Sequence, residues 1–474
     1  MKIINITDVV NATGGILKSR AADDYTVTGI STDSRLVSIG NIFFALSGER
    51  FDGHDYLDSV AQSGAVAVVV EDTAQVPHDY DGAVLVVPDT LRAYQDLAHY
   101  YLKMIHPKVI AITGSVGKTS IKDMMQVAMS AKYKTSYTMG NFNNGIGLPK
   151  TIFDMDDDAQ VLVLEMGMSA PGEIRRLVEI ANPDIAVIGN IGISHRENFE
   201  TDDGIFQAKM EIISAFQDGT TKDGVLIVNA DDSKLGALRQ EDLPCKLIRV
   251  GSGKADIAVH DVTYDEKDGL HFKLDINQAK QDAVPDIDFQ IPVAGTYNAV
   301  NAGIAVAAGD VLDINVKDIA RALTSINRTK HRLDLVERNG IKVIDDTYNA
   351  SPTSMKSGID HLVAITGTRH IAVLSDMLEL GPESKNGHLE VGRYAAEKGL
   401  DLIIAVGEKS KDIYAGAFAA SPDAPDVPDT LVKHFADKLE AARFLDTYVK
   451  EGDVYLLKGS RSTHMEELID AILS

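Results

Sequence analysis

The chain contains one cysteine, no tryptophan and no long hydrophobic run. A single thiol, Cys245, excludes an intrachain disulfide and a zinc site built from cysteines, and a buried small hydrophobic residue is its favoured interpretation over a nucleophile. The longest apolar runs, such as residues 65–70, are far shorter than the roughly 20 residues that cross a bilayer. The first eight residues become polar too early for a secretory signal. We therefore expect a cytoplasmic protein without membrane insertion.

Positive charge is also scarce. Lys and Arg number 46 against 70 Asp and Glu, which gives a formal net charge of −24. This balance argues against nucleic acid or an anionic membrane as the main partner, although it allows a local basic pocket for a phosphorylated small molecule. Hydrophobic residues make up 45% of the 474 residues, enough for several buried cores. At roughly 150 residues per domain, the length predicts about three domains.

The spacing of apolar residues predicts an α/β protein whose three domains span residues 1–88, 89–333 and 334–474. The first is a small α/β unit, and the second has strands alternating with helices, which indicates a mostly parallel sheet. The acidic, alternating stretch 255–292 predicts an antiparallel ribbon at the edge of that sheet. The third unit is predicted to be doubly wound and Rossmann-like.

The expected elements follow from these patterns. Strands are predicted at 42–46, 65–70, 83–87, 108–113, 160–165, 184–189, 224–229, 341–345, 370–375, 401–406 and 453–457. Helices are predicted at 90–105, 118–131, 296–311, 351–365, 386–398, 436–449 and 463–473, and a proline-rich surface loop at 421–428.

A glycine-containing loop lies between a predicted strand and a predicted helix, which is the context that a nucleotide phosphate loop requires. Its glycines let backbone amides turn toward phosphate oxygens, and the helix N-terminus attracts the anion. Lys118 can reach the β- and γ-phosphates, and the Thr119 hydroxyl can hold Mg²⁺. Ile112 stands where the common form of this loop has its first glycine, so a purely structural turn is the alternative. The predicted contacts are Gly114, Ser115, Val116, Gly117, Lys118, Thr119 and Ser120.

A carboxylate at the end of a neighbouring strand should complete the magnesium site. Glu165 ends the apolar run 161–164, and hard oxygen ligands suit Mg²⁺. A solvated loop carboxylate is the alternative interpretation.

Several further segments, in order and spacing, resemble the Mur ligases, the ATP-dependent amide-forming enzymes of peptidoglycan synthesis. In the centre these segments are GNFNNGIG at 140–147, EMGM at 165–168, NIGISH at 190–195 and AKME at 208–211. In the third unit they are DDTYNASP at 345–352, DMLELG at 376–381 with His388, and KGSR at 458–461 with Met465 and Glu466. In the first unit they are TDSR at 32–35, FFAL at 43–46 and GERFDGH at 48–54. The resemblance covers essentially the whole chain.

Within the family, the C-terminal segments resemble the members that join D-alanyl-D-alanine to a UDP-muramoyl tripeptide. The resemblance implies that ATP phosphorylates the tripeptide carboxylate and that the amine of the dipeptide attacks the acyl phosphate. It also implies two Mg²⁺ ions, with Thr119, Glu165, His195 and a carbamylated Lys209 at the metal sites. Read alone, His195 is a structural hydrogen-bond partner and Lys209 a solvated helix residue.

The resemblance places the remaining site residues by position. Arg332, at the hinge between the second and third units, would reach the γ-phosphate, with a domain-boundary salt bridge as the alternative. Asn298, Asn301, Asp346, Tyr348 and Asn349 would contact the nucleotide, and Tyr297 stands where the family commonly has histidine. Ser34, Arg35, Arg50, Asp52 and His54 would meet the UDP-sugar, although charge pairs in a surface turn explain them equally well. Asn143 and Asn144 would also bind substrate, and Asp376 would face the dipeptide or cap a helix.

Other functions stay open at this point. The ligase one step earlier in the series, which adds a single diamino acid, is the nearest rival, and a folate polyglutamate ligase is a more distant one. From another class, the chain could be a nucleotide-driven switch, or a scaffold without activity. The sequence does not tell whether the third peptide residue is lysine or diaminopimelate, nor whether the incoming unit ends in D-alanine or D-lactate. We expect a monomer whose domains move against one another.

Overall fold

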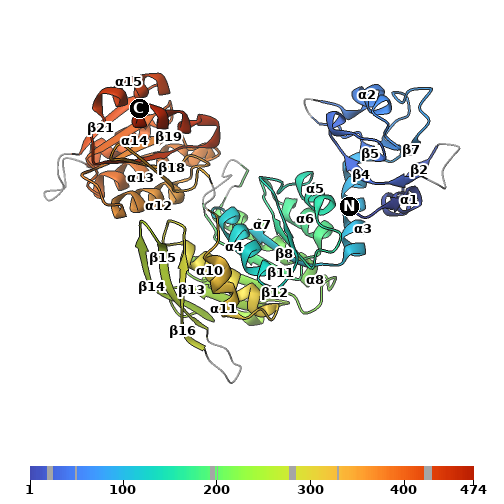
Figure 1. The fold of residues 1–474 in the computed structure, drawn as a ribbon, viewed down its shortest axis with the longest axis horizontal. Coiled ribbons are helices and arrows are strands. Elements are labelled where there is room, and N and C mark those ends of the chain that lie inside the picture. Colours follow the sequence, from blue (N-terminus) through green and yellow to red (C-terminus); the bar gives the residue numbers. More distant parts are fainter. Residues whose placement is uncertain are drawn as a thin grey trace.

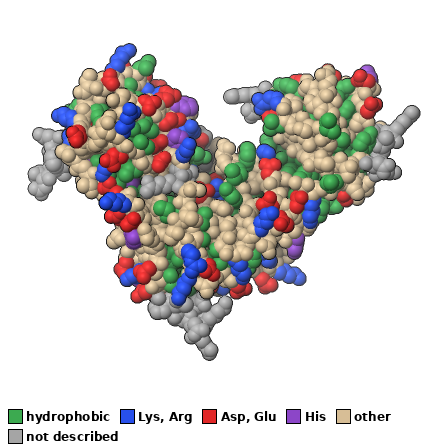
Figure 2. All heavy atoms as spheres, in the orientation of Figure 1, with side chains coloured by type: hydrophobic (Ala, Val, Ile, Leu, Met, Phe, Trp, Pro, Cys, Tyr) green, Lys and Arg blue, Asp and Glu red, His purple; other side chains and the backbone are tan. Residues whose placement is uncertain are grey.

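The computed structural model describes residues 1–18, 25–48, 51–192, 198–199, 201–276, 284–327, 330–420 and 430–474. Three α/β units form a V-shaped molecule, with the central unit at its base and the first and third units on its two arms (Figure 1). The space-filling view shows an open hollow between the arms (Figure 2). None of the described helices is long and apolar enough to span a bilayer.

The N-terminal unit holds a sheet of order β2-β7-β6-β5-β4, parallel except for β2, and a small antiparallel pair of β1 with β3. The predicted strands near 42, 65 and 83 are confirmed as β5, β6 and β7. The elements are β1 (Ile4–Asn5), α1 (Ile6–Thr13), β2 (Ile16–Leu17), β3 (Thr26–Val27), β4 (Gly29–Ser31), β5 (Asn41–Phe44), α2 (Leu57–Gln62), β6 (Ala67–Val70) and β7 (Ala83–Val86), with short 3₁₀ helices η1 (Ser34–Leu36) and η2 (Gly53–Tyr56).

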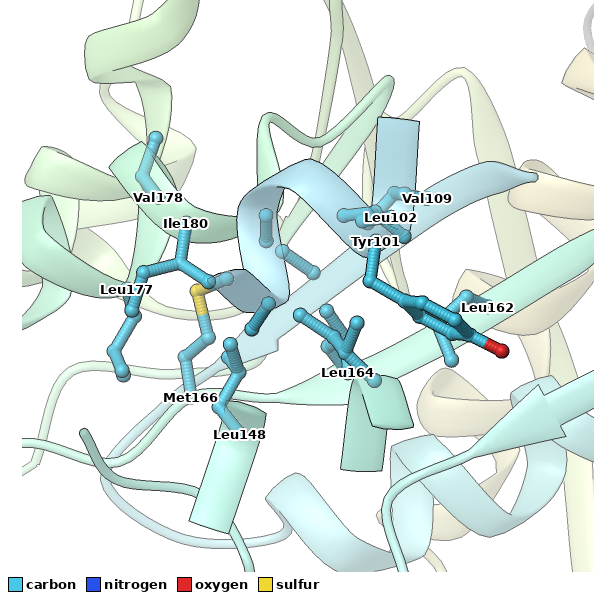
Figure 3. Packing of buried hydrophobic residues seen from close by; sticks show 14 of the residues in the cluster. Tyr101, Leu102, Val109, Leu148, Leu162, Leu164, Met166, Leu177, Val178 and Ile180 are labelled. Atoms are coloured by element: carbon cyan, nitrogen blue, oxygen red, sulfur yellow. The ribbon is translucent and has the colours of Figure 1, made fainter. Parts of the chain in front are cut away.

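Helix α3 (Thr90–Ile105) joins the first unit to the second. Its buried face, with Tyr94, Leu97 and Tyr101, belongs to one hydrophobic core that runs from α1 into the central unit. Figure 3 shows Tyr101 and Leu102 packed among side chains of the central strands. The Tyr101 hydroxyl accepts from the Lys2 amide at 2.7 Å and donates to Asp157 at 3.0 Å. The helix therefore fixes the N-terminal unit to the central one.

The central unit is built on a sheet of order β16-β15-β14-β13-β12-β11-β8-β10-β9. Pairing is parallel from β9 to β14, and the inner strands are buried on both faces, as expected of a sheet covered by helices. Strands β14, β15 and β16 pair antiparallel at one edge, which confirms the predicted ribbon. The strands are β8 (Lys108–Thr113), β9 (Thr135–Tyr137), β10 (Val161–Glu165), β11 (Ile185–Ile188), β12 (Val225–Asn229), β13 (Lys246–Gly251), β14 (Ile257–Asp265), β15 (Gly269–Ile276) and β16 (Val284–Ile291).

Helices of the central unit cover both faces of this sheet (Figure 1). The predicted helices at 118 and 296 are present, and α11 was not predicted because its apolar stripe is short. The helices are α4 (Lys118–Ser130), α5 (Gly147–Asp154), α6 (Glu173–Ala181), α7 (Asp202–Met210), α8 (Ser214–Gln217), α9 (Ser233–Gly236), α10 (Asn298–Val311) and α11 (Val316–Leu323).

The C-terminal unit has a sheet of order β17-β18-β22-β19-β20-β21, parallel except for the edge strand β17. This confirms the predicted doubly wound architecture. The elements are β17 (Asp334–Arg338), β18 (Ile341–Asp346), α12 (Pro352–Ala364), β19 (Arg369–Ser375), α13 (Ser384–Glu397), β20 (Leu402–Val406), α14 (Lys411–Ala420), β21 (Leu431–Phe435), α15 (Lys438–Tyr448), β22 (Asp453–Lys458) and α16 (Ile469–Leu473).

Four details of this unit differ from the sequence prediction, and two of them are the strand β17 and the helix α14, which were not predicted. The helix expected at 463–473 is reduced to α16, preceded by 3₁₀ turns, because His464 adopts a left-handed conformation (φ 49°) that a helix cannot continue through. Strand β21 was not predicted, since it is an edge strand whose apolar residues are partly exposed, Leu431 to 42%. The predicted loop at 421–428 lies outside the described residues.

A buried ion pair anchors the C-terminal sheet. Asp453, 1% exposed at the start of β22, accepts hydrogen bonds from Arg369 Nε at 2.7 Å and Nη2 at 2.6 Å, and from the Tyr455 hydroxyl at 3.0 Å. Removal of one partner leaves the other charge buried without compensation. The pair therefore constrains where β22 meets β19.

We predict that Asp453→Ala lowers the free energy of unfolding by about 3 kcal/mol, measured by urea denaturation of the full chain. The matched control is Asp318→Ala, which removes an exposed pair with Arg321 and should cost less than about 1 kcal/mol. Equal losses in the two variants would contradict this assignment.

Candidate active site

The phosphate loop lies between β8 and α4, as predicted. Gly117, in the left-handed region at φ 77°, precedes the first helical residue, Lys118. Within the described part of the chain, the backbone N–H groups of residues 117–120 donate to no protein acceptor, since the first helical bond runs from Ile121 N to Gly117 O. These four donors and the helix dipole face the same space, which suits an anion.

Asn190, directly after β11, holds this loop from the neighbouring strand. Its Oδ1 accepts from the amides of Ser115 at 3.0 Å and Val116 at 2.9 Å, and its Nδ2 donates to the Val116 carbonyl at 2.8 Å. Sequence reasoning did not single out Asn190. Its position at the carboxyl end of a strand adjacent to β8 was the available signal.

Glu165 ends β10 next to the phosphate loop, where it was expected. The Thr119 hydroxyl donates to Glu165 Oε2 at 3.0 Å, and Asn143 Nδ2 donates to Oε1 at 2.9 Å. Asn143, predicted to bind substrate, thus contacts the proposed metal carboxylate. The Glu165 amide is fixed by the Thr138 hydroxyl at 3.0 Å.

The donor set at Glu165 fits Mg²⁺. A hydroxyl and a carboxylate supply hard oxygen atoms, and such sites are usually completed by phosphate oxygens and water. Among the described residues, no group of three His, Cys, Asp or Glu side chains could hold a metal by itself. Thr119 and Glu165 would therefore hold the ion together with the nucleotide.

Two lysines lie close enough to act on one another. Lys118 Nζ donates to the Gly114 carbonyl at 2.8 Å, and desolvation lowers its pKa, with Glu165 opposing this and Arg332 adding to it. Lys209, on α7, is only 2% exposed. Desolvation, and then the charge of Lys118, hold the pKa of Lys209 well below its usual value. The solvated-helix interpretation of Lys209 is therefore wrong.

Arg332 reaches the same centre from the junction with the C-terminal unit. Its Nη2 donates to Thr119 Oγ1 at 3.2 Å, and its guanidinium lies 4.2 Å from the ring centroid of Tyr348. The Nε atom is buried and has no hydrogen-bond partner among the described residues. The geometry does not match the alternative of a domain-boundary salt bridge, because the contacts are a hydroxyl and an aromatic ring.

A hollow beside the loop is formed by α4, the start of α10 and the hinge. Asn298 and Arg332 line it together with Ser120, Asp123 and Tyr297. Asn301 donates to Asn298 Oδ1 at 2.8 Å and, like Asn298, is buried. Tyr297 is 41% exposed, so its ring is available as one wall. The hollow opens next to the phosphate loop, where a nucleoside would follow its phosphates.

The predicted residues of segment 345–352 are tied to the end of β22, and the Tyr348 amide donates to the His331 carbonyl at the hinge at 3.2 Å. Lys458 Nζ donates to Asp346 Oδ2 at 2.5 Å and to the Asn349 carbonyl at 3.0 Å. Burial raises the pKa of Asp346, while Lys458 opposes that shift. Lys458, 2% exposed, belongs to the KGSR segment that resembles the family but was not predicted as a site residue. It fixes the segment that presents Tyr348 to Arg332.

The N-terminal residues lie apart from this centre, on the other arm of the V (Figure 1). Arg35 pairs with Asp33 at 2.6 Å, and this contact lowers the pKa of Asp33 to about 2. Asp52 Oδ1 accepts from His54 Nδ1 at 2.6 Å, while His54 Nε2 accepts from the Glu71 amide at 3.1 Å. Both ring nitrogens of His54 are thus engaged by protein atoms. Ser34 starts η1, with its turn capped by Asp33.

The remaining predicted residues have structural contacts or cannot be placed. Asn144 Oδ1 accepts from the amides of Ile146 and Gly147 at the start of α5. Asp376, after β19, accepts from the Ser410 amide at 2.7 Å, at the strand end where doubly wound folds bind ligands. His195 and Arg50 lie outside the described residues.

The sequence matches three family models in the order of the three units. Residues 26–104 match the Mur ligase family catalytic domain, 112–309 the Mur ligase middle domain, and 331–461 the Mur ligase glutamate ligase domain. The chain belongs to the Mur ligase family. The phosphate loop, Glu165 and Lys209 all fall within the match to the middle domain, and Arg332 falls within the third match.

Relatives of this Mur ligase match it over nearly the full length. The UDP-N-acetylmuramoyl-tripeptide–D-alanyl-D-alanine ligase of Bacillus subtilis is 36% identical over 472 residues, covering 99% of this chain and 97% of that protein. MurF from Acinetobacter baumannii has a similar structure, with a TM-score of 0.89 at 32% identity, covering 100% and 99% of the two chains. MurF from Thermotoga maritima in complex with ADP has a TM-score of 0.79 at 28% identity, covering 94% and 96%.

We predict that Thr119→Val weakens Mg²⁺-dependent binding of ADP about tenfold, because it removes the hydroxyl shared by Glu165 and Arg332. Calorimetry with excess Mg²⁺ and with a chelator measures this dependence. Thr119→Ser keeps the hydroxyl and should stay close to the wild type. If Thr119→Val retains the full metal effect, Thr119 is not a ligand.

Proposed function

We propose that this Mur ligase joins D-alanyl-D-alanine to UDP-N-acetylmuramoyl-tripeptide at the cost of ATP. The Thr119 hydroxyl contacts both Glu165 and Arg332, and Lys118 lies close enough to interact electrostatically with both, which supports a site for γ-phosphoryl transfer. The full-length likeness to proteins named for this reaction supports the choice of substrates.

The reaction proceeds in two steps. A tripeptide carboxylate oxygen attacks the γ-phosphorus of ATP, which forms an acyl phosphate and releases ADP. The dipeptide amine then attacks the acyl carbon, the C–O bond to phosphate breaks, and the amine loses a proton. Lys118, the amides of residues 117–120 and Arg332 neutralise charge on the transferred group. Mg²⁺, held by Thr119 and Glu165, would supply further positive charge to the phosphate oxygens.

Two Mg²⁺ ions and a carbamylated Lys209 complete the proposal. A neutral amine can take up CO₂, which converts a buried lysine into an anion with two oxygen atoms. Burial of Lys209 beside Lys118 favours the uncharged amine. With His195, the carbamate would serve the second ion.

We also propose the arrangement in which the enzyme works. Residues 1–88 would bind the UDP-sugar, 89–333 ATP, and 334–474 the dipeptide through Asp376. We expect a cytoplasmic monomer, since the substrates are small molecules.

The decisive assay measures phosphate release from MgATP with UDP-muramoyl tripeptide, with and without D-alanyl-D-alanine. We predict release only with both substrates, and a product heavier by the dipeptide less water in mass spectrometry. Tripeptides ending in lysine and in diaminopimelate are both tested, as is a dipeptide analogue ending in D-lactate. Addition of a single diamino acid would favour the earlier ligase, and phosphate release without the dipeptide would favour a nucleotide-driven switch.

Lys118→Ala should reduce this turnover roughly a thousandfold or more, the scale of losing one charged clamp on the transferred phosphoryl group. The exposed Lys317→Ala on α11 is the matched control and should keep wild-type activity. A Lys118→Ala enzyme with near-normal turnover would contradict the proposed site.

The carbamate has its own test. Protein equilibrated with ¹³C-bicarbonate should show a carbamate carbon signal in NMR that is missing from Lys209→Arg, because a guanidinium does not take up CO₂. Identical spectra from the two proteins would show that Lys209 is not modified.

A further inference from the structure

We propose that Asn190 is a positioning residue, whose side-chain amide sets the phosphate loop in the shape that receives ATP. The proposal rests on the proposed function, because it assigns the loop to the nucleotide. Asn190 itself touches the loop backbone and would not contact the reacting atoms.

The Asn190 side chain satisfies three backbone groups of the loop. Its Oδ1 accepts from two consecutive amides, those of Ser115 and Val116, and its Nδ2 donates to the Val116 carbonyl. The two peptide units that flank Val116 are thus held by one planar side-chain amide. Such a bridge fixes the orientation of the Val116 peptide groups, because both their donor and their acceptor are engaged.

The surrounding contacts keep Asn190 in place. The next residue, Ile191, donates its amide to Asp232 Oδ2 at 2.7 Å. Ser115 Oγ donates to the Gly192 carbonyl at 2.9 Å and accepts from the Gly192 amide at 2.8 Å. Segment 190–192 is therefore bonded to the loop on one side and to α9 on the other.

Small residues allow this close approach. A Cβ atom at Gly189 would lie 2.5 Å from Ile121 Cδ1 of α4, and one at Gly192 would lie 3.2 Å from Ser115 Cβ. A side chain at either position would therefore push against α4 or the loop, and glycine at 189 and 192 avoids this crowding. Gly189, Asn190 and Gly192 thus contribute to the same contact.

The backbone amides of the loop therefore fall into two groups with different partners. Those of Ser115 and Val116 are committed to Asn190, whereas those of residues 117–120 have no protein acceptor within the described chain. Loss of the Asn190 side chain would free the Val116 amide, leave the Ser115 amide with only the Asn190 carbonyl at 3.2 Å, and let the loop adopt other conformations. ATP would then have to order the loop when it binds, which weakens its affinity.

Asparagine is the side chain that this bridge requires. Aspartate has the same size and keeps the acceptor for the two amides, but it loses the donor to the Val116 carbonyl and adds a negative charge near the phosphates. Alanine removes all three bonds. Since Asn190→Asp is nearly isosteric, it tests the bridge without opening a cavity.

The experiment measures ADP binding by calorimetry for the wild type, Asn190→Asp and Asn190→Ala. We expect affinity to fall about tenfold or more in both variants, which corresponds to about 1.4 kcal/mol. In the ligase assay the KM for ATP should rise by a similar factor, while the KM values for tripeptide and dipeptide should stay within about twofold, because the Asn190 side chain bonds only to the backbone of the nucleotide loop.

Asn315→Ala is the control for a merely structural effect. Asn315 caps α11 by accepting from the Lys317 amide at 2.9 Å, far from the loop in sequence and in a different helix. Its loss should lower thermal stability without any change in ADP affinity. The proposal is overturned if the Asn190 variants also lose thermal stability without any change in ADP affinity. It is likewise overturned if they raise the KM values for ATP, tripeptide and dipeptide equally.

Failure of the proposed function would look different. A wild type that binds ADP but makes no amide product would contradict the ligase reaction. The ADP affinities of the wild type and the Asn190 variants would still test the positioning role of Asn190. A wild type that does not bind ADP would overturn both.

Discussion

The structure depends on one requirement: the first turn of α4 must keep its backbone N–H groups free while the loop before it stays ordered. A loop usually becomes ordered by bonding its own polar groups, which would consume these donors. Here the ordering comes from the segment after β11, where Asn190 bonds to the amides of Ser115 and Val116 and Gly192 bonds to the Ser115 hydroxyl. The parallel pairing of β8 with β11 brings the two strand ends together, so the sheet topology is what makes the arrangement possible.

A second consequence of the same topology is the placement of Glu165. Strand β10 pairs with β8 on the side opposite β11, so the phosphate loop has a carboxylate on one flank and an amide on the other. Arg332 adds a group from outside the sheet, at the start of the C-terminal unit. That unit is also held by the ribbon, because Glu266 accepts from the Thr366 amide at 2.7 Å and pairs with Lys342. The position of Arg332 over Thr119 is thus linked to contacts at the far edge of the central sheet.

Much of this could be predicted from the sequence, where local patterns decide the outcome. Strand β8, the loop and α4 were recognisable because an apolar run, glycines and Lys118 occur in the order that the phosphate loop needs. Lys209 and Arg332 could be predicted as site residues only from the family resemblance. The residue type alone does not predict that a lysine is buried or that an arginine lies at a hinge. Asn190 and Lys458 were not predicted as site residues, because their roles arise from strand pairing between segments far apart in sequence. The break in the last helix at His464 was missed because a positive φ is uncommon for any single non-glycine residue, so one histidine does not predict a left-handed turn.

The central claim is the division between loop amides that bind Asn190 and those left free for phosphate. Backbone amide NMR of the ¹⁵N-labelled full chain, with and without MgADP, tests it most directly. The account predicts that the amides of Ser115 and Val116 are protected from hydrogen exchange before nucleotide is added. Those of residues 117–120 should exchange quickly in the free protein, then shift and become protected when MgADP binds. Protection of residues 117–120 in the free protein, or nucleotide-induced changes confined to Ser115 and Val116, would contradict the account.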